Sequence, residues 1–453
     1  MRIDNQNKTK ISVIGLGKLG CPMLAVFASK GFEVIGVDIN QEFVDLINKG
    51  LAPVKEPKLQ DMLLSNKERI SATTNIKQAV IETDICFIIV PTPSGKDYFF
   101  KNEYVINAIN AIGNALKDKS GYFNVIVTST VMPGSTGGEI KEALEHSSGR
   151  KVGKNLGLCY NPEFIALGTV VRDMLYPDML LIGESDNKAG DLLEEIYRNS
   201  VESNPSYHRM NWINAELCKI AVNTFVTTKI SYANMIADIC DRLEGANSDI
   251  VTNAVGSDSR IGNKYLKGGI GYGGPCFPRD NKAFAALGDS LGARTDLAKA
   301  TDSINDYQTT RLLDLIKNTI PRESTISILG ISYKPNTPVI EESQGLALAK
   351  ELILLKYTVK LTDPQSIYEI ANQEFFDKNI SADLDQTVKN ADAIIIMTPW
   401  KEYLNMDFSK LNCKYIIDPW RVLNKNVFSE KINLIQPGVG KWFFDIKNTQ
   451  GVN

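Results

Sequence analysis

A single cysteine among small residues is the first place in this sequence where chemistry could be done. The stretch GYGGPCFPRD, residues 271–280, leads through two glycines and a proline into Cys276 and places a carboxylate, Asp280, four residues later. Bare backbone lets a substrate come close and supplies amide donors for a developing oxyanion. A lone cysteine is also a common inert core residue. On these residues alone, Cys276 is either a nucleophile or a small apolar side chain.

The other reactive residue types narrow the available chemistry. The chain has only two histidines, His146 and His208, each in a polar context. Its seven cysteines form no CxxC pair and have no nearby histidines, which argues against a disulfide framework and against a zinc site. We therefore expect no bound metal, and we expect acid–base work to fall to Lys, Asp, Glu or Cys.

The N-terminal segment has the pattern of a cofactor site. A β-rich run at 11–14 meets glycines in GxGxxG spacing, an apolar-periodic helix follows, and a second strand ends in an acid 18 residues after the last glycine. Such glycines let amides approach a pyrophosphate, and the acid accepts hydrogen bonds from a ribose 2′-hydroxyl but repels a 2′-phosphate. The pattern predicts NAD rather than NADP, the alternative being a tight βαβ turn that binds nothing. The predicted contacts are Gly15, Gly17, Lys18, Leu19, Gly20 and Asp38.

Two further buried strands are predicted within 82–93 (ETDICFIIVPTP) and 124–136 (NVIVTSTVMPGST). Both end in proline or small hydroxyl residues, at the edge of a parallel sheet where ligands gather. This adds a second set of predicted cofactor contacts: Pro91, Thr92, Pro93 and Thr130.

The C-terminal part repeats this order of elements. A strand at 325–333, a helix over SQGLALAKELILLKY, a strand ending in Asp363 and a strand within 390–400 follow one another, but GxGxxG is missing. We expect this lobe to bind something other than a second dinucleotide. The predicted fold is α/β, with two Rossmann-like doubly wound lobes joined by a long central helix and a helical middle domain.

Between the lobes, residues 208–305 change character. Apolar positions recur at helical spacing over more than 25 residues without internal Pro or Gly, which is typical of a spine or a dimer interface. Lys219 and Asn223 lie one turn apart on this helix and so share a face. The predicted domains are an NAD-binding domain at 1–207, a central helical domain at 208–305 and a C-terminal domain at 306–453.

Bulk composition places limits on partners. With 453 residues, 43% hydrophobic and 23% charged, the chain has the composition of a multidomain globular protein. A net charge of −3 argues against nucleic acid or a membrane surface as partner. No apolar run approaches the ~20 residues that span a bilayer, and the polar start lacks a signal peptide's apolar region. We expect a cytoplasmic protein.

The chain resembles the nucleotide-sugar 6-dehydrogenases of the UDP-glucose/GDP-mannose dehydrogenase family. The resemblance runs from residue 10 to about 440 and is carried, in the family's order, by GLGKLGCP, VPTP, STVMPG, NPEF, ELCKIAVNTFVTTKIS, RIGNKYLKGGIGYGGPCFPRD and GISYKPNT. It implies oxidation of the C6 hydroxyl of a nucleotide-linked hexose to a carboxylate, with reduction of two NAD. It also implies that Cys276 is the nucleophile that holds the aldehyde as a thiohemiacetal and then a thioester.

The resemblance assigns roles to the neighbours of that thiol. Lys219 is expected to stabilise charge on the C6 oxygen, and Asn223 to donate to the same oxygen. Asp280 and Thr130 are expected to hold a water. Glu163 is the expected general base, although which carboxylate moves which proton stays open. Without the resemblance, Lys219 and Glu163 would be ordinary surface residues.

The resemblance also implies a homodimer or higher homo-oligomer built on the central helix, with Arg260 reaching the substrate of the other subunit. The expected substrate contacts are Glu163, Phe164, Lys219, Asn223, Arg260, Tyr265, Leu266, Lys267, Gly273, Tyr333, Lys334 and Arg421.

The family pattern is broken at three positions. Glu341 stands where an arginine is usual, Leu167 replaces a residue near NAD, and Phe43 replaces an arginine on the adenosine side of the cofactor. Because the glycines and Asp38 remain, we still expect NAD to bind.

UDP-glucose is the expected UDP-sugar, because RIGNKYL and GGPCFPRD are most similar to that branch of the family. GDP-mannose, a UDP-N-acetylhexosamine and UDP-galactose stay open as substrates. Two other classes are alternatives. A single-step hydroxyacid dehydrogenase would need neither the thiol nor the second lobe, and a non-catalytic nucleotide-sugar-binding protein would bind without turnover.

Overall fold

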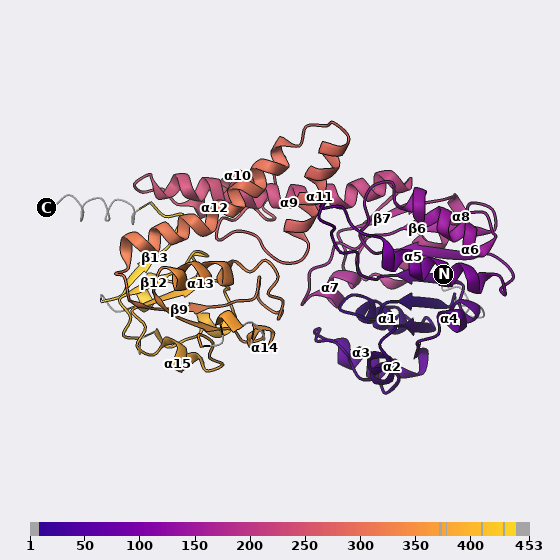
Figure 1. Ribbon diagram of the computed structural model, residues 1–453, viewed down its shortest axis with the longest axis horizontal. Coiled ribbons are helices and arrows are strands. Elements are labelled where there is room, and N and C mark those ends of the chain that lie inside the picture. The colour runs from indigo at the N-terminus through magenta and orange to yellow at the C-terminus, as the bar shows by residue number, and fades with distance from the viewer. Residues whose placement is uncertain (1–8, 371–373, 377, 409–410, 429–430, 441–453) are drawn as a thin grey trace. The chain divides into compact units, whose positions relative to one another are not determined.

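The structure is a computed structural model that describes residues 9–370, 374–376, 378–408, 411–428 and 431–440. The chain divides into two compact units, and the boundary falls between Ala221 and Val222. Each unit contains one sheet (Figure 1). The prediction of two α/β lobes with a long helix and a helical segment between them in sequence is confirmed.

The sheet of the first unit has eight strands in the order β3-β2-β1-β4-β5-β6-β7-β8. All neighbours are parallel except β6 and β7, which are antiparallel. The order reverses between β1 and β4, so the carboxyl ends of these two strands flank the crevice where ligands bind in such sheets. The strands are β1 Ile11–Ile14, β2 Val34–Val37, β3 Ile70–Thr73, β4 Ile85–Ile88, β5 Phe123–Val127, β6 Leu156–Tyr160, β7 Met179–Glu184 and β8 Ser206–Met210.

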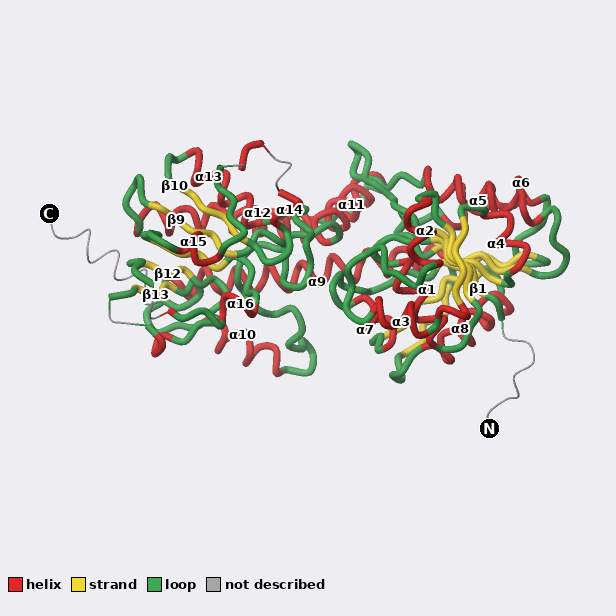
Figure 2. The backbone as a smooth tube through the Cα atoms, turned by 90° about the horizontal axis from the view of Figure 1, so that it is seen from below, coloured by secondary structure: helices red, strands yellow, loops and turns green. Residues whose placement is uncertain are grey.

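Helices cover both faces of this sheet (Figure 2). One apolar core joins one face to α1, α2, α3, α7 and α8, and a second core joins the other face to α4, α5 and α6. Strands buried on both sides read as continuous apolar runs, as in 85–88. The helices are α1 Gly20–Ser29, α2 Gln41–Asn48, α3 Leu59–Ser65, η1 Lys67–Arg69, α4 Ile76–Glu82, α5 Glu103–Leu116, η2 Thr136–Ile140, α6 Lys141–Ser148, α7 Val170–Leu175 and α8 Asn187–Ser200.

Helix α9, Trp212–Asp241, is 30 residues long and contains the boundary between the units. Its sequence has neither proline nor glycine, so nothing interrupts the backbone hydrogen bonds. The predicted long helix is therefore confirmed. Lys219 and Asn223 lie one turn apart on it, one on each side of the boundary.

The second unit has a five-stranded parallel sheet in the order β10-β9-β11-β12-β13, with its switch point between β9 and β11. Its strands are β9 Thr325–Leu329, β10 Thr358–Thr362, β11 Ala393–Ile396, β12 Tyr415–Ile417 and β13 Asn433–Ile435. Its helices are α10 Ser248–Ser257, α11 Phe277–Ser290, α12 Asp296–Thr319, α13 Gln344–Leu354, α14 Ile367–Ile370, η3 Glu374–Phe376, α15 Leu384–Val388, α16 Lys401–Leu404 and η5 Lys425–Val427.

Both lobes have two glycines in close contact after the first strand, although their spacing in the sequence differs between the lobes. Gly15 and Gly330 each follow the first strand with φ near +97° (+96° and +98°). A Cβ on Gly20 would lie 1.8 Å from the carbonyl oxygen of Gly15, and one on Gly345 would lie 2.6 Å from that of Gly330. In the second lobe the pair is separated by a longer loop, and this loop replaces the dinucleotide turn.

Candidate functional site

The predicted cofactor residues of the first unit gather at one edge of its sheet. They follow the carboxyl ends of β1, β2, β4 and β5, and Glu163 and Phe164 follow β6. Because these strands run parallel, their carboxyl ends share an edge even though the residues are far apart in sequence. Thr92 donates its hydroxyl to the carbonyl of Thr130 at 2.7 Å, which ties the loops after β4 and β5 together.

The glycine turn has the shape that a dinucleotide requires. A Cβ on Gly15 would lie 2.5 Å from the carbonyl oxygen of Ile89, whereas a Cβ on Gly17 would meet nothing within 4 Å. Thus Gly15 and Gly20 close the turn, and Gly17 leaves open space for a ligand. The first turn of α1 carries no acid, so its N-terminal amides remain suited to a pyrophosphate.

Asp38 has acceptor capacity left for a ribose. Its Oδ2 accepts from the amide of Leu16 at 2.6 Å and its Oδ1 from the amide of Asn40 at 2.8 Å. A carboxylate has about four lone-pair sites, and this one is partly exposed at the end of β2. The glycines and Asp38 therefore fit NAD.

The equivalent acid of the second lobe, Asp363, is surrounded by hydrogen-bond donors of the protein. Oδ2 of Asp363 accepts from the amides of Ile331 and Ser332, the hydroxyl of Ser332 and the indole of Trp400. Its Oδ1 accepts from the amides of Gln365 and Ser366. Asp363 is buried, so this carboxylate binds protein rather than a ribose.

Glu163 and Lys219 form the polar centre of the first unit. The ammonium of Lys219 donates to the carbonyl oxygen of Glu163 at 2.6 Å and lies 4.7 Å from the centre of the Phe164 ring. Desolvation raises the pKa of Glu163 to about 7, against the lowering effects of Tyr197 and Lys219. A carboxyl group with such a pKa can give and take a proton near neutral pH.

Three residues of this region were not predicted. Glu216 is fully buried and accepts from the amides of Gly134 (2.6 Å) and Thr136 (2.7 Å), so it holds the loop that follows Thr130. The Tyr197 hydroxyl contacts both Asn161 and Glu163. Asn161 opens the NPEF motif, which was a usable signal, but Tyr197 occupies an apolar helix position and gives none.

In the second unit, Cys276 immediately precedes helix α11 and is exposed, unlike the other six cysteines of the described chain. The peptide amides of a helix N-terminus favour negative charge there, which suits a thiolate. Asp280 lies in the first turn of the same helix and is fully buried. Its Oδ2 accepts from Asn223 at 2.6 Å, and its Oδ1 accepts from Arg279 at 2.9 Å.

The glycines before Cys276 lie against the loop after β9. A Cβ on Gly273 would lie 2.2 Å from the carbonyl oxygen of Glu342, and one on Gly274 would lie 2.6 Å from the Tyr333 ring. The amide of Gly274 donates to the carbonyl of Glu341 at 3.0 Å. Glycine is therefore required at positions 273 and 274 for packing within the unit. This packing role was not predicted from the sequence.

Asn305 of α12, another residue that was not predicted, holds the same segment. Its Oδ1 accepts from the amide of Tyr272 at 2.6 Å, and its Nδ2 donates to the carbonyl of Tyr272 at 3.1 Å. The Tyr272 hydroxyl donates to Asp302 at 2.5 Å. The backbone leading to Cys276 is thus fixed from α12.

The remaining predicted substrate residues differ in exposure. Tyr265 has φ +62° and is exposed with its ring against Phe277, whereas Leu266 is buried and Lys267 is exposed. Lys334 lies over the ring of Tyr333, at the switch point of the second sheet. Arg260 is exposed and forms an ion pair with Asp258 at 2.6 Å.

Arg421 does not fit its predicted substrate contact. Its guanidinium donates to both oxygens of Asp249 and to the carbonyls of Gly268, Pro419 and Pro437. These bonds use all five N–H donors of an arginine, and the side chain is buried. Arg421 therefore fastens the loop after β12 to α10 and to the loop at Gly268, and it has no N–H donor left for a substrate.

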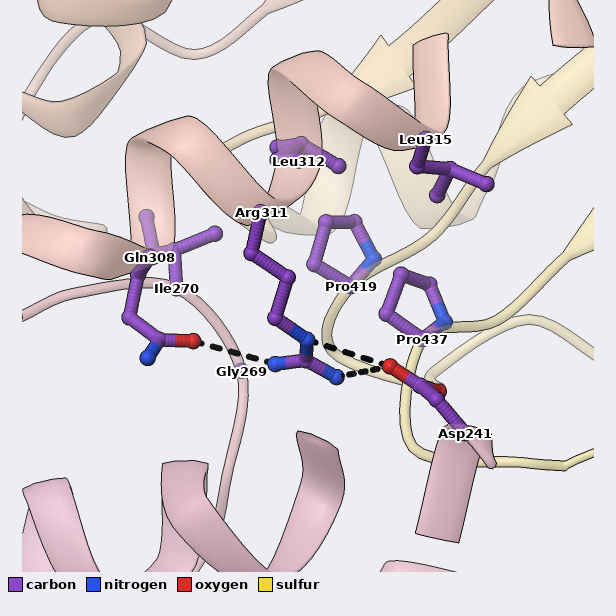
Figure 3. A pocket seen from close by; sticks show the side chains of 9 residues that line it. All are labelled: Asp241, Gly269, Ile270, Gln308, Arg311, Leu312, Leu315, Pro419 and Pro437. Atoms are coloured by element: carbon purple, nitrogen blue, oxygen red, sulfur yellow. Dashed lines mark hydrogen bonds and ion pairs between the residues drawn. The ribbon is translucent and has the colours of Figure 1, made fainter. Parts of the chain in front are cut away.

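A small cavity in the second unit lies beside this loop (Figure 3). It is lined by Asp241, Gly269, Ile270, Gln308, Arg311, Leu312, Leu315, Pro419 and Pro437, and its volume is about 20 Å³. That is room for about one water. Arg311 forms a buried ion pair with Asp241, whose other oxygen accepts from the amide of Gly438 at 2.5 Å. The cavity is structural and too small for a sugar nucleotide.

The three positions that break the family pattern are easily placed. Phe43 is half-buried on α2, and Leu167 packs against the core on the α1 side of the sheet. Glu341 is exposed, and its backbone rather than its side chain holds Gly274.

The described residues contain neither a candidate metal site nor a candidate membrane span. Among residues 9–440, apart from those few whose placement is not described, no cluster of His, Cys, Asp and Glu could hold a metal ion. Within the same part of the chain, no helix is both long and apolar enough to span a bilayer.

Comparison with known families covers most of the chain. Three models of the UDP-glucose/GDP-mannose dehydrogenase family match in order: the NAD binding domain at residues 9–201, the central domain at 213–307 and the UDP binding domain at 327–425. The first match agrees with the glycine turn and Asp38, and NAD is the cofactor.

Individual relatives extend over nearly the whole length. UDP-glucose 6-dehydrogenase AglM of Haloferax volcanii is 33% identical over 92% of this chain and 97% of that protein. GDP-mannose 6-dehydrogenase of Pseudomonas aeruginosa is 32% identical over 85% of this chain and 91% of that protein. The solved UDP-glucose dehydrogenase of Pyrobaculum islandicum is 30% identical with a TM-score of 0.88, covering 97% of this chain and 99% of that one.

Proposed function

Because the chain belongs to the UDP-glucose/GDP-mannose dehydrogenase family, we propose that it oxidises the C6 hydroxyl of UDP-glucose twice, giving UDP-glucuronate. The coarser activity, NAD-dependent dehydrogenation of a nucleotide sugar at C6, is that of the family. The observation that carries the double oxidation is Cys276, an exposed thiol at the start of α11 beside the buried pair of Asn223 and Asp280.

Cys276 gives the reaction its covalent stage. NAD, when bound, supplies the hydride acceptor for both oxidations, so each sugar yields two NADH. The thiolate adds to the C6 aldehyde to form a thiohemiacetal, which becomes a thioester on loss of the second hydride and is then hydrolysed by water. This sequence retains the aldehyde on the protein between the two oxidations.

Lys219 and Asn223 are proposed to bind the C6 oxygen. An ammonium stabilises an alkoxide or a tetrahedral oxyanion, and Lys219 is held by the carbonyl of Glu163. The Asn223 amide has two N–H donors, of which Asp280 takes one. The other suits the same oxygen. Asp280 and Thr130 are proposed to hold the water that hydrolyses the thioester.

Glu163 is proposed as the base in hydrolysis. Its raised pKa of about 7 means that both protonation states are populated near neutral pH. The ionised carboxylate accepts a proton from the attacking water, and the carboxylic acid later releases it. No other protein group with this property lies on the loop after β6.

UDP-glucose is preferred over the alternatives on the pattern of RIGNKYL and GGPCFPRD, and the relatives named UDP-glucose 6-dehydrogenase are consistent with it. The GDP-mannose enzyme of Pseudomonas aeruginosa has almost the same identity. GDP-mannose is therefore the second candidate, with a UDP-N-acetylhexosamine third.

A second copy of the chain is the proposed partner. Phe225, Tyr232 and Ile239 are spaced by seven residues on α9, so they share a face, and all three are exposed. Apolar side chains in such a row are typical of an interface. In a homodimer built on this face, the exposed Arg260 is proposed to reach the partner's substrate.

The test is the number of NADH formed per sugar nucleotide, with limiting UDP-glucose, UDP-N-acetylglucosamine, UDP-galactose and GDP-mannose in turn. We expect two NADH from UDP-glucose and little from the others. Turnover of another sugar instead would keep the mechanism and reject the substrate. One NADH per sugar would reject the thioester stage.

Cys276→Ser is the matched variant, because serine keeps the shape but not the thiolate. We expect it to form no UDP-glucuronate. Cys218→Ser, on the half-buried cysteine of α9, serves as control and should form two NADH per UDP-glucose. Full turnover by Cys276→Ser would leave a non-covalent dehydrogenase as the better reading.

A further inference from the structure

The hydroxyl of Tyr197 lies between two oxygen atoms. Tyr197, on α8, is buried, and its Oη is 2.5 Å from Oδ1 of Asn161 and 3.0 Å from Oε1 of Glu163. All three residues belong to the first unit. A hydroxyl has only one O–H to donate. Tyr197 can therefore donate to Asn161 or to Glu163, but not to both at once.

The orientation of the Asn161 amide is fixed by its other contacts. Its Nδ2 donates to the carbonyl of Leu181 at 2.9 Å, and its backbone amide donates to Val127 at 2.9 Å. A flipped amide would place Oδ1 against the Leu181 carbonyl, oxygen to oxygen. Oδ1 of this fully buried residue is therefore an acceptor that faces Tyr197.

The ionised and the neutral forms of Glu163 differ in how many of these acceptors receive a hydrogen bond. If Glu163 is ionised and Tyr197 donates to it, the fully buried Oδ1 of Asn161 loses the Tyr197 hydroxyl as its donor. If Glu163 carries a proton on Oε1, it donates to Tyr197, which donates to Asn161, and every group is paired. An unpaired buried acceptor bears its full desolvation cost, so Asn161 favours the neutral state of Glu163.

The charged groups around this chain of contacts are few. Desolvation raises the pKa of Glu163 to about 7, while the hydrogen bond from Tyr197 and the charge of Lys219 on α9 act to lower it. Burial raises the pKa of Tyr197 well above its ordinary value, and Tyr207 of β8 adds a minor electrostatic contribution in the same direction. Tyr197 thus remains a neutral hydroxyl throughout the range in which Glu163 titrates.

We propose that Tyr197 and Asn161 are positioning residues that couple the protonation of Glu163 to the direction of one hydrogen bond. When Glu163 loses its proton, the Tyr197 hydroxyl turns from Asn161 to Glu163; when Glu163 regains it, the hydroxyl turns back. The inference rests on the proposed function in one respect, the role of Glu163 in moving the proton of the hydrolytic water. The coupling itself is a property of the protein without substrate.

The test is a titration of Glu163 in full-length protein labelled with ¹³C at the glutamate side-chain carboxyl, with the signal assigned by its loss in Glu163→Gln. In the wild type we expect a midpoint near 7. Asn161→Ala should lower the midpoint by about one pH unit, since ionisation no longer leaves an acceptor unpaired. In a Tyr197→Phe background, Asn161→Ala should cause no further shift, because Asn161 acts only through the hydroxyl.

Asn124→Ala is the matched control for loss of a buried asparagine. Asn124 is fully buried and its Nδ2 donates to the carbonyl of Ala189 on α8 at 2.9 Å, but it does not contact Tyr197. It should lower stability and leave the Glu163 midpoint in place. An unchanged midpoint in Asn161→Ala, or an equal shift with and without the Tyr197 hydroxyl, overturns the proposal.

A second measurement needs no altered Asn161. With ¹³C at the ring carbon that bears the hydroxyl, the Tyr197 signal should change with the same midpoint as Glu163, because the hydroxyl changes partner. A Tyr197 signal that stays constant through the Glu163 titration overturns the coupling. Both titrations are made without substrate, so absence of sugar turnover would reject the proposed function and leave this result standing. If both hold, the acidic limb of the pH–rate profile for UDP-glucuronate formation should also move to lower pH in Asn161→Ala.

Discussion

The side-chain amide of Asn223 donates to the buried carboxylate of Asp280 at 2.6 Å. This bond joins α9 to the first turn of the helix that follows Cys276. Arg279 holds the other oxygen of Asp280 at 2.9 Å. The carboxylate is therefore fixed from two sides, and its position depends on a residue 57 positions earlier in the chain.

Asn223→Asp should both destabilise the protein and lower turnover. The change removes the donor and places a second carboxylate against a buried one, at a cost of about 3 kcal/mol or more. Thermal unfolding and NADH formation measure the two effects. Asn214→Asp, an exposed position on the same helix, should change neither.

Substitutions in the glycine turn should separate folding from cofactor binding. Gly20→Ala places a methyl group 1.8 Å from a backbone oxygen, so we expect a loss of about 3 kcal/mol in stability. Gly17→Ala meets no protein atom within 4 Å and should fold normally, but bind NAD several-fold more weakly. Melting temperature and the Kd for NAD are the readouts, and normal NAD binding by Gly17→Ala would contradict the assigned cradle.

The two strand-end acids should respond differently to neutralisation. Asp38→Asn loses one acceptor oxygen and the negative charge that repels a 2′-phosphate, so the preference for NAD over NADP should fall by about tenfold or more. Asp363→Asn should lower the melting temperature, because its six donors lose a charged partner. It should leave the cofactor preference unchanged. Comparing kcat/KM for the two cofactors in both variants checks this contrast.

Glu163 should make stability pH-dependent. Its pKa is raised from 4.5 to about 7 in the folded protein, so the folded state binds more protons than the unfolded state between these values. Stability is therefore lost as pH rises through this window. Gln cannot ionise, so Glu163→Gln should gain stability relative to the wild type as pH rises across the window. The gain in the free energy of unfolding should be at most about 3 kcal/mol, and it is followed by the melting temperatures of the two proteins. A constant difference from pH 4.5 to 7 would show that Glu163 titrates normally.

The apolar row on α9 should control assembly. Tyr232→Glu introduces a charge into the proposed interface and should shift the mass measured by light scattering from dimer to monomer. Turnover should fall with it, if Arg260 acts on the partner's substrate. Tyr368→Glu, on a tyrosine that is 84% exposed in the second lobe, should leave mass and turnover unchanged.

Features encoded by neighbouring residues were determined by the sequence alone. The glycine spacing with Asp38, the strand ends at Pro91–Pro93 and Thr130, and the uninterrupted helix that became α9 all depend on local spacing and on the absence of Pro or Gly. The motif order identified the family for the same reason, since each motif is short and contiguous. Such features survive in a sequence because their physical basis lies within a few residues.

The tertiary structure decided how polar groups are shared. Arg421 was predicted to bind substrate, yet five acceptors, four of them on Asp249, Gly268 and Pro437, use all its donors. Asp363 has the sequence context of Asp38, but Trp400 and the turn after β9 seal it. Tyr197 gave no signal at all, although its hydroxyl faces Glu163. In each case the outcome depends on which buried donors and acceptors meet across the fold, and residues far apart in sequence meet only once the core has packed.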